Sequence, residues 1–166
     1  MARNNVLFFS NMKKIGILLL GWLVILNLFA LFALNRLNLE PDTAYTWIDQ
    51  NTQVQEQTWN PLPLHAEWDS EWYLDIAENG YSLEGDYGLK NIVFFPVYPF
   101  LLKLLGFLVG GNLLLAGVIL SIATLYGTLL IFHRFIKEFH PDVDSYLPLL
   151  LMLIFPTAFF LNAFYT

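Results

Sequence analysis

Long uncharged apolar runs alternate with polar segments along this chain. Three runs of 20 residues, at 15–34, 113–132 and 146–165, contain no charged side chain. At 1.5 Å per residue, a helix of this length reaches about 30 Å, which matches the hydrocarbon core of a bilayer. A fourth run, 92–109, is interrupted by Lys103 and by two prolines. The pattern predicts an all-α integral membrane protein, a multi-span helical bundle with four spans.

The composition agrees with this pattern. Hydrophobic residues make up 57% of the chain and charged residues 13%, and the mean hydropathy is +0.54. A soluble domain of this size is less apolar, so a soluble enzyme is excluded and no nucleic-acid partner is expected. The chain has no cysteine, so no disulfide pattern indicates its compartment.

The basic residues predict the orientation. Arg3, Lys13 and Lys14 precede the first apolar run, whereas the segment 35–91 holds eleven acidic residues and only two basic ones. Because lysine and arginine stay on the cytoplasmic side, we expect a cytoplasmic tail at 1–14 and an external or luminal loop after the first span. That span is longer than the apolar core of a cleavable signal peptide and is expected to remain as an anchor.

The orientation of the second half depends on the run 92–109. If this run spans, Gly110-Gly111-Asn112 forms a tight cytoplasmic turn, and the polar connection 133–144 lies outside although it carries Arg134 and Lys137. If the run is only re-entrant or interfacial, these two bases are cytoplasmic. We favour the spanning hairpin, because a short glycine-rich turn suits antiparallel neighbouring helices.

The external loop contains the main candidate for chemistry. Its segment from about 64 to 79 is expected to form an amphipathic interfacial helix, ended by Gly80 in a left-handed conformation. On a helical wheel, Asp69 is the one carboxylate that falls within the aromatic arc. A carboxylate withdrawn from water holds a proton more readily, which suits a general base. Alternatively, Asp69 is the N-cap of this helix and its side chain accepts a backbone N–H.

The neighbours of Asp69 also have two explanations. Glu71 and Asp75 can hold sugar hydroxyls or a divalent cation, but a solvated polar face explains them as well. Aromatic residues line sugar sites and also anchor membrane proteins at the interface. The aromatic residues to which both explanations apply are Trp68, Trp72, Tyr73 and Tyr81.

Other residues are candidates for contacts with a lipid carrier. Lys103 lies within an apolar run, where a lysine is costly, so it binds the carrier phosphate or extends to a headgroup. The segment 94–99, which includes Tyr98, shapes the entrance of a carrier groove or starts a helix. His65 is a surface residue or a phosphate contact. No group of histidines and acids has the spacing of a structural metal site, so no cofactor is expected beyond a divalent cation.

Three motifs resemble, in the same order, those of the PIG-V mannosyltransferase family. The segment 67–81 contains Trp-Asp and Ile-Ala-x-x-Gly-Tyr, 91–99 contains Phe-Phe-Pro-x-x-Pro, and 155–166 is similar to the segment that leads to a Tyr-Ser/Thr-Glu motif. The resemblance implies the N-terminal portion of a GT-C membrane glycosyltransferase, related to GPI-anchor biosynthesis. Such an enzyme transfers mannose from a polyprenyl-phosphate carrier to a lipid or glycan acceptor with inversion.

The resemblance also assigns roles to residues. Asp69 matches the family's candidate catalytic aspartate, and it can take the proton of the acceptor hydroxyl. The chain ends at Thr166, just before the family's Glu, so we expect it to be the front part of a longer protein. The substrate-binding candidates are Trp68, Glu71, Trp72, Tyr73, Tyr98, Lys103 and Tyr165.

Two other classes of protein remain open. A transporter also has broken helices and an intramembrane lysine. A non-catalytic membrane subunit or an inactive fragment is the other alternative. Because the sequence carries no organelle signal, the bacterial plasma membrane is preferred over the endoplasmic reticulum.

Overall fold

The fold is helical throughout the part of the chain that the structure describes. The computed structural model describes residues 2–36, 65, 69–82 and 91–161, and these contain no strand. Two of the helices, α1 (Ala2–Arg36) and α4 (Leu113–Phe139), contain apolar stretches long enough to cross a bilayer. The expected helices at 15–34 and 113–132 lie within them, so the all-α prediction is confirmed for the described residues.

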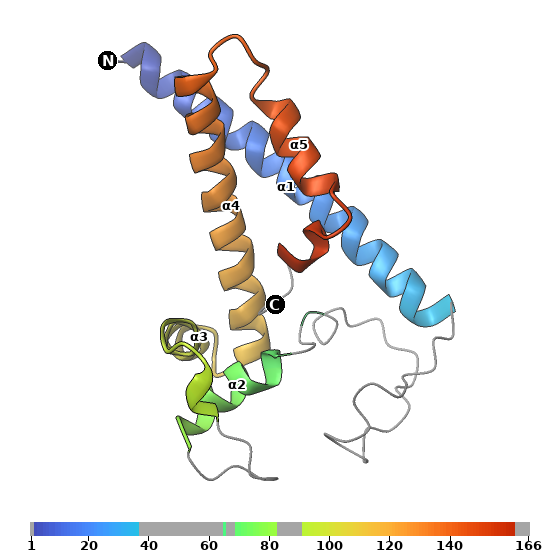
Figure 1. The fold of residues 1–166 in the computed structure, drawn as a ribbon, viewed down its shortest axis with the longest axis vertical. Coiled ribbons are helices and arrows are strands. Elements are labelled where there is room, and N and C mark those ends of the chain that lie inside the picture. The colour runs from blue at the N-terminus through green and yellow to red at the C-terminus, as the bar shows by residue number, and fades with distance from the viewer. Residues whose placement is uncertain (1, 37–64, 66–68, 83–90, 162–166) are drawn as a thin grey trace.

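Helix α4 is the axis on which the other helices pack (Figure 1). Near its N-terminal end it contacts α2 (Ser70–Asn79) and α3 (Val97–Leu108), and Ala77, Leu102 and Ala116 form the buried centre of that contact. Along its C-terminal half it contacts α1 and α5 (Tyr146–Ile154). The buried side chains of this second cluster are Ile15, Leu19, Leu125, Leu129, Leu149 and Leu153.

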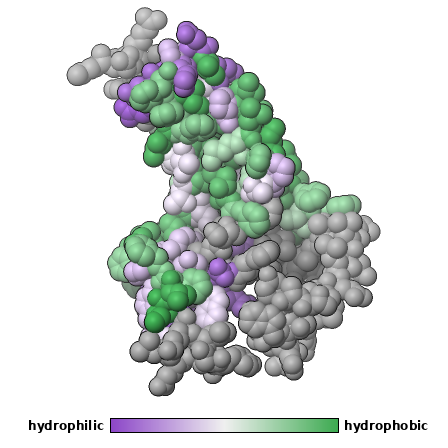
Figure 2. All heavy atoms as spheres, viewed as in Figure 1, coloured by the Kyte–Doolittle hydropathy of each residue, from purple (hydrophilic) through white to green (hydrophobic). Residues whose placement is uncertain are grey.

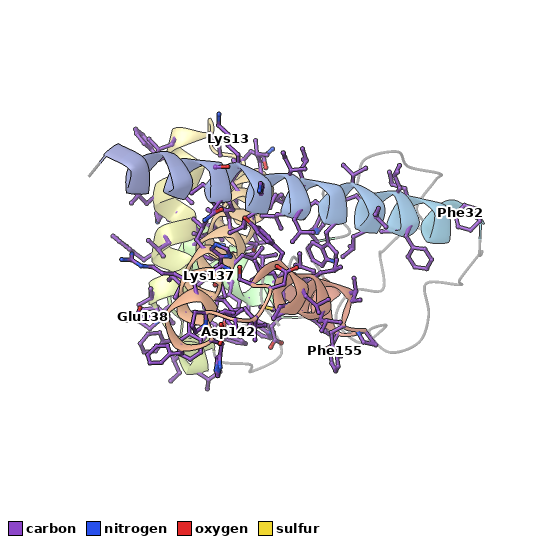
Figure 3. The ribbon with its side chains drawn as sticks, turned by 90° about the horizontal axis from the view of Figure 1, so that it is seen from above. Lys13, Phe32, Lys137, Glu138, Asp142 and Phe155 are labelled. Carbon is purple, nitrogen blue, oxygen red and sulfur yellow. The ribbon has the colours of Figure 1, made fainter. Side chains whose placement is uncertain are left out.

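Helices α1 and α4 run in opposite directions. The Tyr126 hydroxyl of α4 donates a hydrogen bond to the Met12 carbonyl of α1 over 3.1 Å. Figure 1 shows the beginning of α1 and the end of α4 at the same, upper end of the molecule, and Figure 3 views that end with Lys13 and Lys137 labelled. Hydrophilic residues gather there, above a largely hydrophobic flank (Figure 2). The basic residues that flank both long helices therefore lie at one end.

Helix α4 is longer than the apolar run that predicted it. It has 27 residues and continues through 133–139, which we expected to belong to a polar connection. Leu129, His133 and Ile136 are all buried, and their spacing of four and three residues continues the packed stripe of the helix. The connection to α5 is therefore shorter than expected, at 140–145.

The segment 92–109 differs from the predicted span. A 3-10 turn, η3 (Asn91–Val93), is followed by a break and then by α3, whose 12 residues reach only about 18 Å. Pro96, which has no N–H to donate, stands at the N-cap of α3 and separates the two elements. Figures 1 and 3 agree that α3 lies across α4 and does not run antiparallel to it. The helix within 92–109 is therefore shorter than the predicted 18-residue span.

The glycine-rich segment between α3 and α4 forms a turn, but the two helices that it joins are not antiparallel as predicted. Gly110 and Gly111 have φ values of +72° and +88°, which favour glycine. The Gly111 N–H donates to the Gly106 carbonyl over 2.8 Å, and the Asn112 side chain caps α4 by accepting from the Leu115 N–H at 2.9 Å.

The segment 146–165 does not form one continuous helix. Helix α5 has nine residues and ends before Phe155, whose φ of −61° and ψ of 138° are extended, as the residue before a proline prefers. After Pro156 the chain resumes as a short 3-10 helix, η4 (Ala158–Leu161). The predicted helix at 146–165 is therefore divided at Pro156 into two shorter elements.

Candidate functional site

Asp69 stands at the beginning of α2 with its carboxylate exposed. The predicted helix at 64–79 is observed from Ser70, and Asp69 is its N-cap residue, with φ −74° and ψ −2°. The Asp69 backbone carbonyl accepts the N–H groups of Trp72 at 3.1 Å and Tyr73 at 3.4 Å, but its side chain makes no capping hydrogen bond. The N-cap position is thus confirmed, whereas the capping role expected of the carboxylate is absent.

An aromatic wall, formed by Trp72, Tyr73, Phe94 and Tyr98, follows Asp69. Phe94 stacks on Trp72, with ring centroids 5.8 Å apart, and meets the edge of Tyr73 at 5.0 Å. Tyr73 also contacts Tyr98 at 5.6 Å. The Tyr81 hydroxyl donates to the Phe94 carbonyl over 2.7 Å. Residues of the first two sequence motifs, which are separate in the sequence, are therefore in contact in the structure.

Tyr73 is the member of the wall whose ionisation responds to Asp69. Burial raises the pKa of the Tyr73 hydroxyl above its usual 10.0, and the negative charge of Asp69 raises this pKa further. Tyr73 therefore keeps its proton at neutral pH and can donate a hydrogen bond.

Asn91 joins the end of α2 to the loop that follows it. Its side chain, 3% exposed, donates to Asp75 Oδ2 at 3.1 Å and to the Gly80 carbonyl at 3.3 Å, and it accepts the Ser82 N–H at 2.8 Å. Asn79 donates to the other oxygen of Asp75 at 2.8 Å. Asp75 thus receives protein amides, which favours a structural role over a sugar or cation contact. Sequence reasoning missed Asn91, because no local pattern marks a partner 16 residues away.

Gly80 ends α2 in a conformation that favours glycine. Its φ is +87°, as the prediction required, but its ψ of −171° makes it extended and not left-handed helical. The Gly80 N–H closes the helix on the Ile76 carbonyl at 2.9 Å. An added Cβ would touch nothing within 4 Å, so only backbone strain opposes a larger residue here.

Lys103 lies outside the buried stripe of α3. That helix buries Pro99, Leu102 and Gly106, whereas Lys103 is exposed among apolar neighbours such as Phe107, which is 84% exposed. This position favours the extension of Lys103 to a headgroup. Glu71 is exposed in the first turn of α2. Across the described residues, no three His, Cys, Asp or Glu side chains form a group that could hold a metal ion.

His65 is buried, contrary to the expectation of a surface residue. Its Nε2 lies 2.9 Å from Oδ1 of Asn27 on α1. Two of the predicted site residues, Trp68 and Tyr165, lie outside the described residues. The structure thus brings Trp72, Tyr73 and Tyr98 together next to Asp69.

Comparison with known proteins adds one match. The family model described as Mannosyltransferase (PIG-V) matches residues 5–166. This range covers the site and all three motifs. No curated protein and no solved structure matches.

Proposed function

Because this chain belongs to the mannosyltransferase (PIG-V) family, we propose that it transfers mannose from a polyprenyl-phosphate carrier to a hydroxyl of a lipid or glycan acceptor, with inversion, at the external or luminal face of a membrane. The observation that carries the proposal is Asp69, whose exposed carboxylate makes no capping bond and lies next to the aromatic wall.

The distribution of charge supports the proposed face. Lys13, Lys14, Arg134 and Lys137 lie toward one end of α4, and α2 and α3 pack at the other. A helix of 27 residues is about 40 Å long, enough to separate the two ends by a bilayer. Because basic residues mark the cytoplasmic side, the site belongs to the opposite side. If α3 lies across α4 and does not span the membrane, Lys13 and Lys14 lie on the same, cytoplasmic side as Arg134 and Lys137.

The exposed apolar surface supports a membrane setting. Along α1, Ile17, Ile25 and Phe29 are 71%, 70% and 68% exposed, which would be costly in water over so long a helix. In a bilayer these side chains face lipid. A carrier with an isoprenoid tail then reaches the site laterally, and its phosphate stays at the depth of the headgroups.

The proposed reaction is a direct displacement. The acceptor oxygen forms a bond to the anomeric carbon while the bond from that carbon to the carrier phosphate breaks, and the phosphate leaves on the carrier. Asp69 takes the proton of the acceptor hydroxyl, as a general base does. Aromatic faces such as Trp72 pack against the apolar face of the sugar, and the protonated Tyr73 donates to one of its oxygens.

The proposal is tested with Asp69→Asn. Mannose transfer from a polyprenyl-phosphate donor with radioactive mannose is measured in membranes that contain the full chain. We expect transfer to fall by roughly 10²–10⁴-fold, because the amide cannot accept the proton. The control is Asp142→Asn, an exposed acid beyond the end of α4, which should transfer normally. Undiminished transfer by Asp69→Asn would contradict the role of Asp69.

A further inference from the structure

A polar link joins α1 to the segment that leads to Asp69. Asn27 lies within the apolar stretch Ser10–Phe32 of α1, where a polar side chain is costly unless it is hydrogen-bonded. The Asn27 Nδ2 donates to the Leu23 carbonyl over 2.8 Å, so its Oδ1 is left to accept from His65 Nε2 at 2.9 Å. His65 is 8% exposed. Each residue of the pair satisfies a polar atom of the other away from water.

The link fixes a depth. Asn27 precedes Leu34, the last residue of the uncharged apolar run 15–34, by seven residues, which places it about 10.5 Å inside that end along the helix axis. His65 therefore lies below the level at which α1 leaves the apolar zone. Asp69 follows His65 by four residues, and a chain of that length spans at most about 14 Å. The carboxylate is tethered near the boundary of the apolar zone.

We propose that the hydrogen bond between His65 and Asn27 is a positioning device that sets the depth of Asp69 relative to the membrane boundary. The inference rests on the proposed function, in which a carrier phosphate held among the headgroups fixes the height of the reacting sugar. A base at any other height would miss the acceptor hydroxyl. His65 and Asn27 act through the position of Asp69 and do not touch the substrate.

The depth itself can be measured without any activity. The chain has no cysteine, so Asp69→Cys provides a single site for an environment-sensitive fluorophore, whose depth is read by lipids that carry a quencher at known positions. We expect His65→Phe or Asn27→Leu to shift the depth of the label, because neither variant can form the hydrogen bond between positions 65 and 27. His65→Gln, which keeps a donor, should leave it in place, as should His140→Phe, a change at an exposed histidine beyond α4. An unchanged depth in both His65→Phe and Asn27→Leu would overturn the proposal.

Kinetics give a second, independent test. In the chain with Asp69 intact, His65→Phe should lower kcat roughly tenfold, because a misplaced base reacts slowly, while KM for the donor stays unchanged. His65→Gln should restore the rate. Combining His65→Phe with Asn27→Leu should cost no more than either change alone, because both remove one interaction. Normal kcat in His65→Phe would refute the positioning role, whereas absence of transfer by the unaltered chain would refute the proposed function and leave the depth measurement standing.

Discussion

Replacing Asn91 by alanine should loosen the joint between α2 and the segment 91–99. The substitution removes the donor to Asp75 and to the Gly80 carbonyl, and it also removes the Asn91 oxygen that accepts the Ser82 N–H. Asn91 is 3% exposed, so water does not readily replace what is lost. The aromatic wall depends on this joint. Asn91 begins η3, Phe94 follows the end of η3, and the Phe94 ring packs on Trp72 and Tyr73 of α2.

The size of the effect follows from the three bonds. A neutral hydrogen bond contributes about 1 kcal/mol and a bond to a charged group about 2 kcal/mol. Asp75 is exposed and keeps its hydrogen bond from Asn79, so losing the hydrogen bond from Asn91 to Asp75 costs almost no free energy. The two backbone partners remain, and together they lose about 2 kcal/mol of local stability. This loss corresponds to roughly 30-fold faster opening of the end of α2.

Hydrogen exchange, read by mass spectrometry, measures this opening directly. The peptide that covers 70–82 should exchange roughly 30-fold faster in Asn91→Ala, whereas a peptide from the middle of α4 should be unchanged. Asn79→Ala is the matched control, since it removes a single exposed bond and should cost about 0.5 kcal/mol or less. If Asn91→Ala exchanged no faster than Asn79→Ala, the hydrogen bonds of Asn91 would not hold the site together.

Two further predictions concern the same region. Gly80→Ala should destabilise the end of α2 by about 1–2 kcal/mol, since the Gly80 φ of +87° is strained for alanine. The control, Gly127→Ala, lies in the interior of α4 with nothing within 4 Å of the added Cβ, and it should be neutral or stabilising. Thermal unfolding compares the two variants, and equal melting temperatures would contradict the strain at Gly80. Because the pKa of Tyr73 is raised in the fold, its contribution to stability is complete below pH 10.0 and is lost as the pH rises through the raised value. Tyr73→Phe should flatten that loss in an unfolding series at alkaline pH, and an equally steep loss would show that Tyr73 is not its source.

Much of the helical framework could be predicted from hydropathy. The long uncharged runs located α1 and α4, and the glycines at 110 and 111 located the turn before α4, because both signals act locally. The hydropathy pattern did not locate the ends of the helices correctly. Pro96 and Pro156 divide apolar runs that a hydropathy pattern treats as continuous. The uncharged run 113–132 ends before His133, but α4 continues because His133 lies on its buried stripe.

The site was predictable only in part. Asp69 and the aromatic residues stand out in sequence because acid and aromatic side chains gather within one short segment. The roles of Asn91 and His65 could not be predicted, since their partners lie 16 and 38 residues away and only the packed chain brings them together. The choice between capping and an available carboxylate at Asp69 also required the backbone and side-chain geometry of the N-cap.

The sidedness of Asp69 decides whether a lipid-linked sugar at the outer leaflet can reach it. Asp69→Cys and Lys137→Cys each introduce a single thiol into a chain that has none, and a membrane-impermeant maleimide applied to sealed vesicles of known orientation reports which side each thiol faces. We expect position 69 to react from the external or luminal side and position 137 to react only after the membrane is opened. Reaction of position 69 from the cytoplasmic side alone would contradict it.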